Sequence, residues 1–204
     1  MVNLTLERDG NSPDEIWFLE HPPVFTLGLA GKQEHLINPG SIPMVRSDRG
    51  GQVTYHGPGQ LICYLLLDLK RKNLPIRKLV QLMEQAVIDM LAAEGLVAGT
   101  KTGAPGVYIK GEKIAALGIR VRRGCCYHGL ALNVNMDISP FLRINPCGYP
   151  GLRVTQLKDH GVEMSVYQAA DALLPCLLHN LGYAGYNVIH EFKSERLLPV
   201  AARI

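Results

Sequence analysis

The sequence predicts an α+β fold in a single domain that spans residues 1–204. Three observations predict it: two separated segments with helical periodicity, several shorter apolar segments of strand length, and no Gly/Ser-rich linker to divide the chain. A chain of 204 residues can bury a core without disulfides or metal ions. Its 47% apolar and 19% charged residues are typical of a folded soluble protein rather than a disordered one.

The first part of the chain contains short strand patterns. Ile16–Glu20 and Val24–Leu27 are predicted strands separated by a His-Pro-Pro sequence, and the loop Gly28–Gly40 follows them. Leu61–Leu67 is a continuous apolar run, which is typical of a fully buried strand, although periodicity alone also permits a helix.

Two segments are predicted helices. Apolar residues recur at helical spacing over Ile76–Glu94, after Pro75 and before Gly95. The second helix begins at Ser165, where Gln168 completes a capping-box pattern. It runs towards Gly182, and Pro175 is expected to kink it.

Strands are predicted between these helices. Val107–Lys110 and Lys113–Val121 flank the Gly111-Glu112 pair, which indicates a hairpin. Leu130–Asn135 alternates apolar and polar residues, as a half-buried strand does. The expected architecture is therefore a mixed β-sheet flanked by helices.

Charge and composition exclude several classes of function. The formal net charge of +3 is too small to indicate a nucleic-acid-binding protein. No apolar run approaches the roughly 18 to 20 residues that cross a bilayer, and the first twenty residues are too polar for a signal peptide. We therefore expect a cytoplasmic protein with reduced thiols that binds neither nucleic acid nor membrane.

The cysteines and histidines do not form a recognisable metal-binding pattern. Five cysteines without a C-x-x-C pair indicate neither a disulfide framework nor a zinc site, and the seven histidines lack metal-ligand spacing, so no metal is expected. Cys63 and Cys176 lie in apolar segments, and the simplest interpretation is that they are core residues. Cys125 and Cys126 follow a basic stretch that would favour a reactive thiolate, so they remain candidates beside Cys147.

Three segments carry candidate chemistry. Residues 49–60 contain four glycines, which let the backbone approach a ligand closely, or else form a pair of tight turns between strands. Within them Arg49 is suited to bind a carboxylate or phosphate and His56 to move a proton. Lys113 opens an apolar strand where burial would favour its neutral amine, although a lysine beside a turn is more often solvated. Cys147 lies in a Pro/Gly-rich loop whose N–H groups can stabilise an oxyanion.

Four motifs in order resemble the lipoyl(octanoyl) transferase family of lipoate biosynthesis. They are RGGQVTYHGPGQ (49–60), GEKIAALGIR (111–120), HGLALNVNMD (128–137) and SPFLRINPCGY (139–149). The resemblance covers about residues 14–156 and implies the lipoate/biotin protein ligase fold. Family members usually carry an extra strand and a longer helix before the IWFLEH segment, so we expect the N-terminal region here to be shortened.

The resemblance also implies roles for particular residues. The catalytic pair would be Cys147, which carries the acyl group as a thioester, and Lys113. Substrate-contact positions would be Arg49, Gly50, Gly51, Gln52, Val53, Thr54, Tyr55, His56, Ala116, Leu117, Gly118, Gly129, Leu130 and Ala131. Small residues among them would leave a slot for the acyl chain, with Leu117 and Leu130 as its walls.

The implied partners are proteins. The donor would be acyl carrier protein, which carries octanoyl on its phosphopantetheine, so no further cofactor is expected. The acceptors would be the lipoyl domains of 2-oxoacid dehydrogenase E2 subunits and the glycine-cleavage H protein. Because acyl carrier protein is acidic, a basic group is expected to dock it, or else to form a solvated face. This group comprises Arg120, Arg122 and Arg123, with Lys70, Arg71 and Lys72.

Three other functions stay open on the sequence. An ATP-dependent lipoate or biotin ligase shares the implied fold but needs no nucleophilic cysteine. A non-catalytic module that binds acyl carriers would not gain an acyl group, and a thioesterase would release free acid rather than transfer it to an amine.

Overall fold

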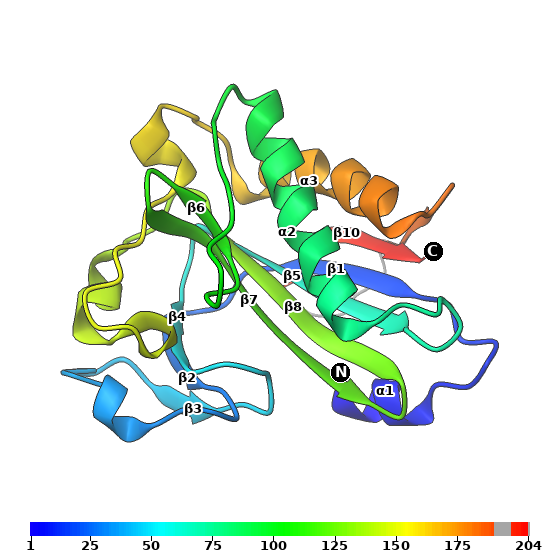
Figure 1. Cartoon of the computed structure of the whole chain (residues 1–204), viewed down its shortest axis with the longest axis horizontal. Coiled ribbons are helices and arrows are strands. Elements are labelled where there is room, and N and C mark those ends of the chain that lie inside the picture. Colours follow the sequence, from blue (N-terminus) through cyan, green and yellow to red (C-terminus); the bar gives the residue numbers. More distant parts are fainter. Residues whose placement is uncertain (190–196, 204) are drawn as a thin grey trace.

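The computed structural model describes residues 1–189 and 197–203. Within them the chain forms a seven-stranded sheet, a three-stranded sheet and three α-helices (Figure 1). The helices are α1 (Val2–Glu7), α2 (Ile76–Ala93) and α3 (Val166–Leu181). The strands are β1 (Glu15–Leu19), β2 (Val24–Leu27), β3 (Met44–Arg46), β4 (Val53–His56), β5 (Gln60–Asp68), β6 (Val107–Ile109), β7 (Glu112–Arg122), β8 (Cys125–Asn133), β9 (Asn187–Ile189) and β10 (Leu197–Arg203).

The large sheet has the strand order β6-β7-β8-β5-β1-β10-β9, and each of its neighbouring pairs is antiparallel. The small sheet has the order β3-β2-β4, with β3 parallel and β4 antiparallel to β2. Residues 28–43 connect β2 to β3, and this long connection is what a parallel pairing requires. The small sheet therefore contains both a parallel and an antiparallel pair of strands, whereas the large sheet is antiparallel throughout.

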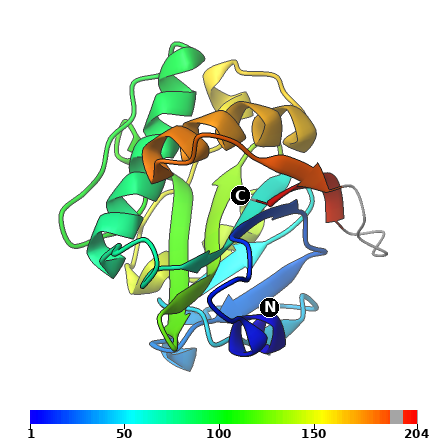
Figure 2. The ribbon, with the colours of Figure 1, turned by 90° about the vertical axis from the view of Figure 1, so that its right-hand side faces the viewer.

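Helices α2 and α3 cover one face of the large sheet (Figure 2). In α2, the buried residues Leu79, Met83, Val87 and Met90 recur at helical spacing and pack on the sheet. Helix α3 begins at the predicted capping box, in which Ser165 accepts from the Gln168 N–H and the Gln168 side chain accepts from the Ser165 N–H. Both predicted helices and the α+β fold class are confirmed.

One hairpin turn differs from its predicted position, and a second hairpin turn was not predicted. The β6–β7 turn is Lys110-Gly111, with φ values of 48° and 88°, so Glu112 already belongs to β7. The β7–β8 turn is Arg123-Gly124, with φ values of 52° and 86°, so β8 begins at Cys125 rather than at residue 130. Positive φ at both central residues matches the right-handed twist of the flanking strands, which favours such two-residue turns.

The remaining elements lie at the edges of the two sheets. Strands β9 and β10 follow α3 and add to the β1 side of the large sheet, which the sequence patterns did not predict. Helix α1 precedes β1 in the sequence. No helix in the described part of the chain is long and apolar enough to cross a membrane.

Candidate active site

Lys113 and Cys147 lie side by side although 34 residues separate them in the sequence. The Lys113 Nζ atom is 3.2 Å from the Cys147 Sγ atom and donates a second hydrogen bond of 2.9 Å to the carbonyl of Pro105. Lys113 is buried near the start of β7, where only 4% of it is exposed. The lysine is therefore not the solvated turn residue that the sequence alone would favour.

The loop that carries Cys147 is fixed by backbone pairing on both sides. Before it, the Asn145 N–H donates to the His35 carbonyl. After it, the Lys113 N–H donates to the Arg153 carbonyl, and the Lys113 carbonyl accepts from the Thr155 N–H. The loop is thus held at its start by the 28–40 loop and at its end by the strand that bears the lysine.

Cys147 has a backbone conformation that side chains rarely adopt. Its φ is 57°, and Gly148 follows with a φ of 79°. A Cβ on Gly148 would lie 3.1 Å from Gln52 Cγ and 3.3 Å from His35 Nε2. The glycine therefore lets the turn close against the 28–40 loop while the thiol faces the lysine.

Charge couples the two side chains. Burial alone would lower the pKa of Lys113, but the charge of the Cys147 thiolate, with the nearby Tyr108, raises that pKa above its usual value. The Lys113 Nζ atom also lies 5.2 Å from the centroid of the Tyr108 ring. The two side chains are therefore close enough to form an ion pair when both are charged.

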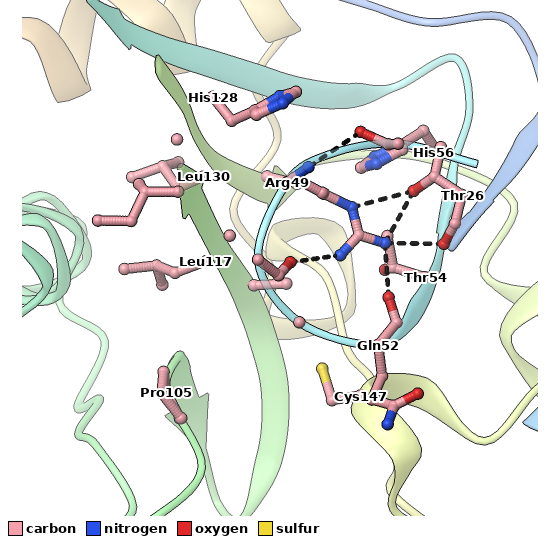
Figure 3. A pocket seen from close by; sticks show the side chains of 18 of the residues that line it. Thr26, Arg49, Gln52, Thr54, His56, Pro105, Leu117, His128, Leu130 and Cys147 are labelled. Atoms are coloured by element: carbon pink, nitrogen blue, oxygen red, sulfur yellow. Dashed lines mark hydrogen bonds between the residues drawn. The ribbon is translucent and has the colours of Figure 1, made fainter. Parts of the chain in front are cut away.

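Arg49 makes several hydrogen bonds within the protein, while its binding of a ligand carboxylate or phosphate stays a prediction. Its guanidinium donates to the carbonyls of Thr26, Gly50 and Gln52 at 2.7 to 2.9 Å, and to the Thr26 hydroxyl (Figure 3). Burial lowers the pKa of Arg49 to about 10, which leaves it charged at neutral pH. Arg49 therefore holds the glycine-rich loop together and adds positive charge near Cys147.

Glycines make room for this guanidinium. A Cβ on Gly28 would lie 2.9 Å from the Arg49 Nη1 atom, and a Cβ on Gly51 would lie 3.4 Å from it. Gly118 on β7 also faces the arginine, because its Cβ would lie 3.4 Å from Arg49 Cδ. Gly51 and Gly118, which were predicted to contact a substrate, thus approach the arginine side chain.

Lys113 and Cys147 both line a cavity of about 380 Å³. Figure 3 shows Leu117 and Leu130 on one side of it and Arg49 on the other. All but one of the predicted substrate-contact residues line this cavity: Arg49, Gly50, Gly51, Gln52, Val53, Thr54, His56, Ala116, Leu117, Gly118, Gly129, Leu130 and Ala131.

Tyr55 is the exception. Successive side chains on a strand point to opposite faces, so Thr54 and His56 line the cavity while Tyr55 points away from it. Tyr55 packs between Phe25 and Phe141, with ring centroids 5.5 and 5.6 Å away. It belongs to the core of the small sheet, and its predicted substrate contact is not supported.

The cavity also has polar residues that the motifs did not single out. His21 Nε2 lies 2.7 Å from the Tyr64 hydroxyl, and His128 Nε2 lies 2.8 Å from Asp48 Oδ1. The Tyr127 hydroxyl donates to the same carboxylate. His128 follows the buried Tyr127 with a φ of 63°. The positive φ lets two consecutive side chains reach one carboxylate, which no alternation pattern would predict.

The other candidate cysteines lie away from the lysine. Cys125 and Cys126 are buried in β8, and burial raises the pKa of both thiols, that of Cys126 to about 12. Cys63 is buried in the core, and burial raises the pKa of its thiol. Cys147 is thus the cysteine among these four that lies beside an ammonium.

The arginines predicted to dock a carrier lie at the opposite end of β7. Arg122 is nine residues beyond Lys113 on that strand, which is roughly 30 Å at about 3.3 Å per residue. Arg71 donates to the buried Asp14, and the Lys72 ammonium lies 3.7 Å from the centroid of the Tyr183 ring. These two therefore have partners within the chain, while Arg122 and Arg123 are exposed.

Comparison with known sequences identifies the family of this chain. Residues 2–177 match the lipoyl protein ligase A/B catalytic domain. The chain belongs to this family. Within it, an octanoyltransferase from Azoarcus sp. (strain BH72) is 62% identical over 182 residues, which are 89% of this chain and 80% of that protein.

Solved structures of this fold include ligases. A lipoate-protein ligase A bound with ATP superposes with a TM-score of 0.74 at 18% identity, covering 88% of this chain and 77% of that one. A biotin protein ligase from Aquifex aeolicus has a TM-score of 0.55 at 19% identity, covering 79% and 71% of the two chains. At such identities the likeness shows the fold alone. The predicted family, fold and acyltransferase class are confirmed.

Proposed function

We propose that this family member is an octanoyltransferase that carries the octanoyl group as a thioester on Cys147 and passes it to a lysine of a lipoyl domain. The observation that carries the proposal is the 3.2 Å contact between Lys113 Nζ and Cys147 Sγ, two residues that line the cavity. The octanoyltransferases that match most of this chain support the acyl group and the reaction.

In the first half-reaction the Cys147 thiolate attacks the thioester carbonyl of the donor. A new C–S bond to Cys147 forms, the C–S bond to the donor breaks, and Lys113 protonates the leaving thiolate. Arg49 adds a second positive charge near the sulfur and the developing oxyanion. Lys113 is then a neutral amine beside an uncharged thioester.

In the second half-reaction the amine of the acceptor lysine attacks the Cys147 thioester. The neutral Lys113 accepts a proton from that amine, a C–N bond forms and the C–S bond to Cys147 breaks. The thiolate and the ammonium are thereby restored, and the kinetics are ping-pong.

The cavity provides a binding site for the acyl chain. Burial of an octanoyl tail contributes up to about 5 kcal/mol at roughly 0.8 kcal/mol per CH₂ group. Leu117 and Leu130 supply apolar walls, and the paired Gly118 and Gly129 leave the space between the walls open. The chemistry needs no cofactor beyond the carrier that brings the acyl group.

The proposed donor is acyl carrier protein, and the proposed acceptors are lipoyl domains of 2-oxoacid dehydrogenase E2 subunits and the glycine-cleavage H protein. All are soluble proteins, which is in keeping with a cytoplasmic site of action. The exposed arginines at the β7–β8 turn and the exposed Lys101 and Lys110 by the β6–β7 turn supply positive charge for an acidic carrier.

Mass spectrometry of the intact protein tests this function. After incubation with octanoyl acyl carrier protein and no ATP, the wild-type protein should gain one octanoyl group, and addition of a lipoyl domain should remove it. Cys147→Ala should gain none, whereas Cys176→Ala, a change outside the cavity in α3, should behave as wild type.

Three results would contradict the proposal. Strict dependence on ATP would indicate a ligase, and the absence of any mass gain in the wild-type protein would indicate a binding module. Release of free octanoate without transfer would indicate a thioesterase.

A further inference from the structure

We propose that Glu84 of α2 is a positioning residue for Lys113 and acts through a single peptide bond. That peptide joins Pro105 to Gly106. The Glu84 carboxyl group accepts a hydrogen bond from its N–H, and the Lys113 amine donates a hydrogen bond to its carbonyl. The inference rests on the proposed acyl transfer and adds to it a residue that does not itself line the cavity.

Glu84 is a buried carboxyl group on an otherwise apolar face of α2. Only 8% of Glu84 is exposed. The other buried residues of the helix are Leu79, Met83, Ala86, Val87, Met90 and Leu91. A carboxyl group is costly to bury unless hydrogen bonds compensate it. Val80, one turn before Glu84 on the same side of the helix, lines the cavity. This part of α2 therefore lies next to the active site, and the buried carboxyl group needs a partner there.

The partner of Glu84 is a peptide unit that also contacts the lysine. The Gly106 N–H donates to Glu84 Oε1 at 2.8 Å, and Lys113 Nζ donates to the Pro105 carbonyl at 2.9 Å. A trans peptide is planar, and its N–H and carbonyl point in opposite directions. The helix and the lysine thus hold the two ends of one rigid unit. The direction of the carbonyl is therefore determined by the carboxyl group behind it.

Gly106 makes this restraint necessary. Its φ is 140°, and a Cβ there would lie 2.7 Å from the Ala115 carbonyl oxygen and 2.9 Å from Lys113 Cε. The absence of a side chain lets the lysine lie against the backbone, but glycine also rotates more freely than other residues. The Tyr108 hydroxyl holds the preceding carbonyl, that of Ala104, at 2.9 Å. Glu84 supplies the restraint on the next peptide, which is the one that Lys113 uses.

The restraint matters most after Cys147 has been acylated. Burial lowers the pKa of Lys113 and the charge of the Cys147 thiolate raises it, so the thiolate attracts the ammonium in the resting enzyme. A thioester carries no such charge. Of the two hydrogen-bond acceptors of Lys113, only the Pro105 carbonyl is then unchanged. Glu84 should therefore affect transfer to the acceptor amine, in which Lys113 accepts a proton, more than it affects loading of the sulfur.

Timing the two half-reactions separately tests this inference. Mass spectrometry of rapidly quenched samples follows the gain of octanoyl on Cys147 from octanoyl acyl carrier protein. It then follows the loss of octanoyl after the loaded enzyme is mixed with a saturating concentration of lipoyl domain. The loss is a first-order process of loaded molecules, so its rate constant does not depend on the fraction of the protein that is folded.

Three variants give distinct expectations. Glu84→Leu removes the acceptor, so transfer should slow by about tenfold or more while loading stays within about threefold of wild type. Glu84→Gln keeps an oxygen that accepts from the Gly106 N–H, so transfer should return to within about threefold of wild type. Glu94, an exposed glutamate that follows α2, provides the control, and Glu94→Leu should leave both rates unchanged.

Glu84→Met is a second apolar variant in case Glu84→Leu does not fold. Equal slowing of loading and transfer would overturn the inference, as would unchanged transfer in a folded apolar variant. Transfer by Glu84→Gln as slow as in the apolar variants would also overturn it, because the acceptor oxygen would then have no effect. If neither apolar variant folds, Glu84 serves the stability of the fold and the inference is wrong. Failure of the wild type to load or transfer octanoyl counts against the proposed function instead.

Discussion

The ammonium of Lys113 has two fixed partners of different chemical character. One is the Cys147 sulfur, which changes from thiolate to thioester during the proposed reaction, and the other is the carbonyl of Pro105, which does not change. The carbonyl keeps the amine in place when the charge on the sulfur disappears. The Pro105 carbonyl thus fixes the position of the Lys113 amine, whereas the charge of the Cys147 sulfur affects its protonation.

Protonation of His56 makes a testable contribution to stability. The pKa of this histidine is about 3 in the folded protein, against 6.5 for an ordinary histidine. Between these values the unfolded chain binds a proton that the folded chain does not, so stability is present at pH 7 and is lost as the pH falls. From pH 7 to pH 5 the contribution of His56 should fall by about 2 kcal/mol.

Urea unfolding of the wild type and of His56→Gln at both pH values measures this effect. The variant should lose less stability than the wild type over the same interval, whereas His179→Gln on the surface should match the wild type. An equal loss in the wild type and in His56→Gln would contradict the buried neutral imidazole.

At the scale of elements, two turns bring the reactive residues together. The Lys110-Gly111 turn starts the strand that carries Lys113, and the Pro146–Gly148 turn presents Cys147. Each depends on positive φ values that glycine adopts at little cost. The geometry of the site is therefore determined by turn residues as much as by the reactive side chains.

The glycines of the Cys147 loop offer a matched comparison. Gly148 and Gly151 both have positive φ, at 79° and 73°, but only a Cβ at Gly148 would have close neighbours. Gly148→Ala should lower the rate of Cys147 acylation about tenfold or more, because the turn must move away from Gln52. Gly151→Ala should cost about 1 kcal/mol of stability and leave acylation within about threefold of wild type. Equal acylation rates in the two variants would contradict this account.

The sequence predicted those elements whose signal is local. The periodicity of α2 and the capping box of α3 each depend on neighbouring residues, and the motif order pointed to Lys113 and Cys147. The half-buried strand predicted over Leu130–Asn135 is wrong in its burial, because every residue of β8 is buried. The function of Arg49 could not be predicted, because its partners at Thr26 and Gly118 come from other strands. The neutral state of His56 could not be predicted either, because it depends on burial of the ring in the folded chain.

At the scale of the whole molecule, the buried Asp14 joins segments from most of the chain. Its carboxylate accepts from Arg8 at 2.9 Å, Arg71 at 2.7 Å, the Asp68 N–H at 2.8 Å and the Tyr183 hydroxyl at 2.5 Å. These partners come from the N-terminal segment, the end of β5 and the segment after α3. The Asp14 side chain thus connects the N-terminal segment to the end of β5 and to the segment that follows α3.

Asp14→Asn should therefore lower the free energy of unfolding by about 3 kcal/mol, since it leaves the buried Arg8 without its anionic partner. Chemical denaturation measures the loss, and Asp171→Asn on the exposed face of α3 is the control that should change stability by less than about 0.5 kcal/mol. A loss below about 1 kcal/mol for Asp14→Asn would show that the network is not coupled as described.

The hydrogen bond from Lys113 to the Pro105 carbonyl affects the interval between departure of the donor protein and arrival of the acceptor protein. Because it retains Lys113 whether or not the sulfur is charged, the loaded enzyme need not reorganise after the donor leaves. The proposed Cys147 thioester can persist until an acceptor arrives. Its structure does not depend on which carrier supplied the acyl group. A single pool of charged enzyme can then serve several different recipients, with the choice among them made at the moment of encounter.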